Sequence, residues 1–177
     1  MVPEAELGQT EAGLVPKSPG WFVLNARDAK WSDGHFGAFA PFEGPDARFE
    51  QLGMNIAVLQ PGQPSSLYHR EDTQEDFLLL SGECLLLIEG EERLLRAWDF
   101  VHCPAYAEHT FVGAGDGPCV LLGIGARPTS EVVYPAAEVA RRHGAGAEET
   151  TSKPQEAYAP FERDVDLPYR EGWLPGS

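Results

Sequence analysis

The chain has 177 residues, of which 42% are hydrophobic, and a formal net charge of −15. This length predicts one domain that buries about 70% of its unfolded surface. The acidic balance disfavours nucleic acid and anionic membranes as partners, because both would repel the protein. The sequence contains no run of about eighteen apolar residues, so we expect no membrane-spanning helix.

Residues 1–20 are rich in Glu, Gly and Pro and show no periodicity, which predicts a mobile lead-in. They lack the basic-then-apolar layout of a signal peptide, so we expect a cytoplasmic protein. The cysteines favour the same location, because they lie in apolar runs without CxxC spacing and are expected to be reduced and buried. They are Cys84, Cys103 and Cys119.

Residues 21–127 carry the signals of short strands separated by turns. Aromatic side chains and glycines alternate over 31–49, which predicts a packed loop with short strands. Alternation over 52–59 predicts a strand that buries its even-numbered face, from Leu52 to Val58. Further strands are expected at 77–80, 84–88, 92–95, 98–103, 109–112 and 119–125. About seven such strands predict an all-β sandwich or barrel.

The last segment, residues 128–177, has a different character. A short helix is expected between Pro135 and Gly144, and a further helical turn at 155–158. Several aromatic side chains in this segment need a surface to pack on, so we expect an arm that lies across the barrel or across a partner subunit. They are Tyr134, Tyr158, Phe161 and Trp173.

Residue types that bind metals fall on two extended segments of the predicted barrel. His69, Glu71 and Glu75 precede the apolar run at 77–80, and His109 follows about thirty residues later. Segments joined by strand-turn-strand sequence can bring these side chains together only if the sheet curls. The pattern therefore predicts a pocket inside a β-barrel.

These residues resemble the two motifs of the cupins, in particular single-domain, cupin 2-like proteins, whose jelly-roll barrels often hold one metal ion. The first motif is Gly, five residues, His-x-His, three or four residues, Glu, six residues and Gly; the second contains Pro and His. The matching residues are Gly62, Glu75, Gly82, Pro104 and His109. Three positions depart from the second motif, with Trp98, Tyr106 and Gly113 where Gly, Gly and Asn are usual. The resemblance implies a jelly-roll barrel, and the residue patterns outside the motifs add a short C-terminal helix and flanking arms.

The His-x-His positions are ambiguous by one residue. Counted from the first glycine they are Tyr68 and Arg70, and counted back from Glu75 they are His69 and Glu71. Alternate strand residues face opposite sides, so only one pair can face the pocket. We predict the second pair, because an inward arginine would need a buried anionic partner. In the other register, Arg70 would pair with Glu75 in a metal-free site that binds an anion.

The predicted ligand set is His69, Glu71, Glu75 and His109. Such nitrogen and oxygen donors suit zinc, iron, manganese or nickel, of which the sequence selects none. The resemblance makes a metal-dependent isomerase, lyase or oxygenase plausible, acting on a small molecule such as a sugar or organic acid. Nearby polar side chains are candidates for substrate contact or proton transfer. They are Tyr68, His102 and Tyr106.

Two other functions stay open at this point. One is a non-catalytic cupin that binds a small ligand without metal, which the broken His-x-His favours. The other is a storage or assembly role, for which the chain has no duplicated barrel. The resemblance also implies a homodimer, since cupin barrels commonly pair through a sheet edge and this chain has aromatic arms at both ends.

Overall fold

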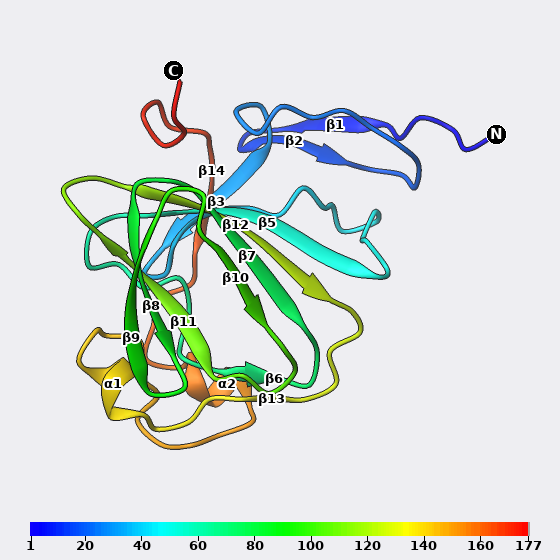
Figure 1. Ribbon diagram of the computed structural model, residues 1–177. Helices are drawn as coiled ribbons and strands as arrows, with labels where there is room; N and C mark the ends of the chain where they lie inside the picture. The colour runs from blue at the N-terminus through cyan, green and yellow to red at the C-terminus, as the bar shows by residue number, and fades with distance from the viewer. Residues whose placement is uncertain (177) are drawn as a thin grey trace.

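The computed structural model describes residues 1–176 and shows two antiparallel sheets packed face to face (Figure 1). The larger sheet has seven strands in the order β10-β7-β12-β5-β4-β3-β14, and the smaller has the order β11-β8-β9. The larger sheet contains β3 (Lys30–Gly34), β4 (Gly37–Ala40), β5 (Leu52–Leu59), β7 (Glu75–Ser81), β10 (Phe100–Cys103), β12 (Cys119–Ala126) and β14 (Val165–Pro168). The smaller contains β8 (Glu83–Ile88), β9 (Glu91–Arg96) and β11 (His109–Ala114). This architecture confirms the predicted all-β jelly-roll barrel.

The register of β5, β12 and β7 fills one end of the barrel and leaves the other hollow. Residues directly opposite in antiparallel strands share a face, so each register line is a row of inward side chains. From the filled end outward the rows are Ala57, Leu121 and Leu79; then Asn55, Gly123 and Phe77; then Gly53, Gly125 and Glu75. The glycines of the last two rows leave space where the filled end holds leucine.

Strand β5 is covered on both faces, whereas the sequence predicted one buried face, the even-numbered one. Its interior face is the odd-numbered set, which includes Ala57 and Leu59 in the barrel core. The even-numbered set, which includes Ile56 and Val58, packs on the outer side with Trp31 and Trp173. Both faces are therefore covered, and the larger side chains mark the covered outer face rather than the barrel interior.

The C-terminal segment lies across its own barrel. It contains β13 (Val132–Val133), α1 (Glu138–Arg141) and α2 (Pro154–Ala157), followed by β14, which pairs with β3. Gly144 adopts a φ of 70° just past the first helix, a left-handed conformation that glycine accepts without strain. The Trp173 ring then packs on Trp31 at a centroid distance of 5.1 Å. The predicted short helix and arm are both present.

Residues 1–20, expected to be a mobile lead-in, contain a β-hairpin instead. It is formed by β1 (Leu7–Thr10) and β2 (Gly13–Pro16). The hairpin buries Val15 and is joined to the next segment by the Leu14 N–H, which donates to the Asp28 carbonyl at 2.8 Å. These partners lie outside the segment, which explains why its own composition gave no sign of order. Among residues 1–176, no helix has the length and apolar character needed to cross a membrane.

Replacing Trp173 by alanine is expected to lower the free energy of unfolding by about 2–4 kcal/mol, because the side chain is 9% exposed and fills the outer face of the sheet. Urea denaturation measures this loss. Trp21→Ala is the matched control, since that side chain is 52% exposed and should lose less than half as much. Equal losses in the two variants would contradict the role of Trp173 as a packing anchor.

Candidate metal centre

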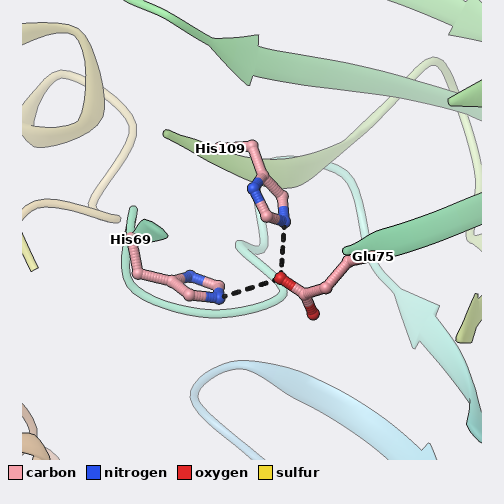
Figure 2. A group of neighbouring side chains, drawn as sticks. All are labelled: His69, Glu75 and His109. Atoms are coloured by element: carbon pink, nitrogen blue, oxygen red, sulfur yellow. Dashed lines mark ion pairs between the residues drawn. The ribbon is translucent and has the colours of Figure 1, made fainter. Parts of the chain in front are cut away.

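Three side chains from separate segments converge at the hollow end of the barrel (Figure 2). His109 begins β11 and Glu75 begins β7. His69 lies just before β6 (Arg70–Glu71), and its backbone forms an antiparallel bridge with His109. The His69 N–H donates to the His109 carbonyl at 3.1 Å, and the His109 N–H donates back at 2.8 Å. This pairing places both imidazoles on the same face.

The donor atoms of the three side chains are close enough to share one ion. The Glu75 Oε2 lies 3.3 Å from His109 Nε2 and 3.7 Å from His69 Nε2. One donor atom from each residue lies within 4.8 Å of the others. Ligand atoms around a metal at bond lengths of about 2.1 Å are separated by about 3–3.5 Å, so small side-chain movements would complete the geometry.

Backbone carbonyls fix the orientation of both imidazoles. The Nδ1 of His69 lies 2.8 Å from the Leu67 carbonyl, and the Nδ1 of His109 lies 3.0 Å from the Ala107 carbonyl. A carbonyl only accepts, so each Nδ1 carries a hydrogen, and each ring in its neutral form presents the Nε2 lone pair. The Nε2 of His109 is buried without a hydrogen-bond partner among the described residues. The three residues therefore fit a divalent ion.

Charge interactions within the group favour a positive charge at its centre. Burial opposes protonation of His109, but the neighbouring Cys103 thiol and Glu75 carboxylate outweigh it and raise the His109 pKa to about 10. Burial and the charge on His109 lower the pKa of His69. Burial raises the pKa of Glu75, but His109 more than compensates and the net shift is downward. Without a metal, the Glu75 carboxylate is thus balanced by a proton on His109, and a metal cation could take the place of that proton.

The group lines a cavity of about 130 Å³ inside the barrel. Its other walls are apolar side chains and three small polar ones. They are Phe39, Ala57, Phe77, Phe111, Leu121 and Gly123, with Asn55, Ser65 and Ser66. A second cavity, of about 260 Å³, shares Asn55, Glu75, Phe77 and Gly123 with the first and forms its mouth. The glycine rows of β5 and β12 make the space for both.

Glu71, predicted as a fourth ligand, lies outside this group of three. Its Oε2 accepts a hydrogen bond from the Thr129 hydroxyl at 3.0 Å, and both residues line the mouth. Burial, followed by the Glu75 charge, raises the pKa of Glu71. Arg70 points elsewhere, with its Nη1 3.3 Å from the Glu108 Oε1. The structure therefore brings His69 to the cavity and leaves Arg70 away from it.

None of the three predicted polar candidates lines the inner cavity or its mouth in residues 1–176. Tyr68 is fully buried among residues of α1 and the smaller sheet, and its hydroxyl accepts from the Gly90 N–H at 3.0 Å. His102 is exposed on β10, with Nδ1 2.7 Å from the Asp76 Oδ1. Tyr106 is 56% exposed. These positions give the three side chains no contact with a molecule in the cavity.

Sequence reasoning missed the neutral polar residues of the cavity and one aromatic neighbour. Ser65 and Ser66 lie in the motif segment, but serines in a Pro/Gly-rich turn give no signal of their own. Asn55 alternates with apolar residues on β5, a weak signal of an interior polar position. The Tyr134 ring lies 5.9 Å from the His69 ring, a contact that depends on where the C-terminal arm docks.

Comparison with known proteins supports the same fold. Residues 55–125 match the cupin domain family, so this part of the chain is a cupin domain. A polyketide cyclase from Streptomyces resistomycificus matches with a TM-score of 0.55 at 14% identity, covering 63% of this chain and 83% of that one. This similarity concerns the fold.

Two further structures match less closely in shape. A sugar phosphate isomerase of the cupin superfamily from Silicibacter pomeroyi has a TM-score of 0.48 at 25% identity, covering 55% of this chain and 69% of that one. A candidate sugar phosphate isomerase from Acidithiobacillus ferrooxidans has a TM-score of 0.44 at 29% identity and covers 48% of this chain. The match spans only 55% of the latter protein's length. No functionally curated protein matches the sequence.

The apparent affinity for a divalent metal is expected to fall by about tenfold for each pH unit of acidification. The His109 pKa is raised to about 10, so below that pH a metal ion must displace one proton from the group. Competition with a chelator of known affinity, repeated across neutral pH, measures the slope. A pH-independent affinity would show that no imidazolium is displaced.

Proposed function

We propose that this protein holds one divalent metal ion through His69, Glu75 and His109 and acts on a small molecule in the barrel cavity. The observation that carries the proposal is the convergence of two Nε2 atoms and a carboxylate, with both Nδ1 atoms already committed to backbone carbonyls. Two histidines and one carboxylate suit zinc, iron, manganese or nickel. The protein is proposed to be an isomerase, lyase or oxygenase for a small polar substrate such as a sugar or organic acid.

The residues of the cavity would bind and orient this substrate. A bound ion would supply Lewis acidity that polarises a substrate oxygen. Phe77 and Phe111 form an apolar wall that excludes water, and the Asn55 amide can donate to and accept from a substrate oxygen. Glu71 stands at the mouth, where its carboxylate can accept a hydrogen bond from an entering hydroxyl.

A non-catalytic, small-ligand-binding role is the second candidate. It is favoured by the absence of Tyr68, His102 and Tyr106 from the cavity walls within residues 1–176, which leaves mainly neutral hydrogen-bonding groups beside the proposed ion. Such a protein would bind its ligand without turnover. Single-turnover assays on the metal-loaded protein separate the two roles, because only an enzyme changes the ligand.

His69→Ala and His109→Ala are each expected to lower the affinity for metal by at least about 100-fold, because each removes one of three ligands. Elemental analysis of untagged protein, followed by chelator competition, measures this loss. His102→Ala and Arg70→Ala are the controls and should keep full metal content, since neither side chain lines the cavity. If Arg70→Ala abolished ligand binding while both cavity histidines were dispensable for metal, a metal-free anion site would replace this proposal.

We also propose a cytoplasmic homodimer. The three cysteines are free and buried, which fits a reducing compartment. Strands β9 and β10 are both sheet edges, and they and the turn between them carry exposed apolar side chains. These are Leu94 on β9, Trp98 in the turn and Phe100 on β10, at 65%, 74% and 64% exposure. An exposed apolar edge is a surface that a second copy can cover.

Sedimentation at micromolar concentration is expected to give a species of twice the 19.3 kDa chain mass. Trp98→Glu should shift this species to the monomer by placing a charge in the apolar edge. Val23→Glu is the control, because that side chain is 83% exposed and lies on another part of the chain. A single wild-type species of one chain mass would count decisively against the dimer.

A further inference from the structure

We infer that the metal site proposed above accepts an uncharged or cationic molecule and excludes anions such as phosphate esters. The inference rests on that proposed site and narrows its substrate class. Four charged side chains line the cavity and its mouth, apart from the two histidines. Three of them are acidic, namely Glu43, Glu71 and Glu75, and the fourth is Arg127.

Arg127 offers no free charge to an entering anion. Its Nη1 and Nη2 donate to the Glu43 Oε1 and Oε2 at 2.7 and 2.9 Å, a bidentate pair. Nη1 also donates to the Phe49 carbonyl at 3.0 Å. The guanidinium packs so closely on Gly53 that a Cβ there would meet its nitrogens at 2.7 and 2.9 Å. It is therefore held by Glu43 on one side and by the backbone on the other.

The remaining two carboxylates oppose an anion directly. Glu71 accepts a hydrogen bond from the neutral hydroxyl of Thr129, and Glu75 belongs to the proposed ligand set. A divalent ion would balance these two charges and leave no net positive charge for a phosphate or a second carboxylate. A desolvated anion in this space would be destabilised, because buried charges need a compensating partner.

The uncharged lining suits hydroxyl and carbonyl groups. Asn55 lines both cavities, and Ser65 and Ser66 line the inner one. The inner volume of about 130 Å³ corresponds to about four water molecules. A small polyol, hydroxyamide or aminoalcohol therefore matches the site in size, polarity and charge. Among the substrates proposed above, this favours the sugar-like class over organic acids.

The test compares two probes of the same size and the same pair of oxygen donors, neutral glycolamide and anionic glycolate. Both are titrated calorimetrically into protein loaded with Co²⁺. We expect the ratio of glycolamide affinity to glycolate affinity to be higher for the Co²⁺-loaded protein than for free Co²⁺ in solution. Glu43→Gln should strengthen glycolate binding by about tenfold and change glycolamide binding by less than about twofold, and Glu71→Gln should also strengthen glycolate binding by about tenfold. Glu138→Gln, on the exposed side of α1, removes the same charge elsewhere and should change neither.

A second arm needs no metal and keeps the inference separate from the metal proposal. Inorganic phosphate should not bind the metal-free wild-type protein but should bind Glu43→Gln, in which Arg127 loses its carboxylate partner at the mouth. If the protein takes up no Co²⁺, the proposed metal function fails, and the phosphate arm still decides the charge preference. The inference would be overturned if phosphate bound the metal-free wild-type protein. It would also be overturned if the Co²⁺-loaded protein showed the same ratio of glycolate to glycolamide affinity as free Co²⁺.

Discussion

The backbone bridge between His69 and His109 is the constraint on which the candidate centre depends. Its two hydrogen bonds set the register between the motif segment and β11, and the register decides which side chains enter the barrel. A slip of one residue would turn Tyr68 or Arg70 inward and remove an imidazole. The Tyr68 N–H donates to the Ala145 carbonyl at 2.8 Å, so the C-terminal arm holds the segment in place from outside. The arm therefore contributes to the site without entering it.

Space inside the barrel comes from small residues rather than from a larger barrel. Along β12 the interior positions change from Leu121 to Gly123 and Gly125, while the strand keeps its pairing with β5 and β7. A Cβ at Gly123 would meet the Phe77 ring at 3.3 Å, so this row is already in close contact. A Cβ at Gly125 would meet Glu75 at 3.6 Å, an ordinary contact that would narrow the mouth. The two glycines thus set the depth and the width of the cavity separately.

The sequence was sufficient for the fold and for the segments that carry the site, because alternation and turn residues are local signals. Spacing singled out Glu75 and His109, and the cost of burying an arginine favoured His69 over Arg70. Alternation also placed Glu71 beside His69, but β6 has only two residues and pairs with β13, and Glu71 turns to Thr129. Three other features depend on distant segments: the outward position of Tyr68, the choice of which β5 face lines the barrel, and the order of the N-terminal hairpin. No local pattern encodes contacts with Ala145, Trp173 or Asp28.

One ion pair links the architecture of the mouth to its chemistry. Arg127 follows the last residue of β12, and Glu43 lies in the loop that leads from β4 to β5, so their pair ties two segments together at the barrel rim. The same contact neutralises the one basic side chain among the described residues of the mouth. Partly exposed ion pairs add little stability, because water screens them and ordering long side chains costs entropy. The main effect of the bidentate pair is therefore on ligand binding. Because Glu43 occupies the Arg127 guanidinium, that side chain offers no free positive charge to attract anions into the cavity beside the proposed ion.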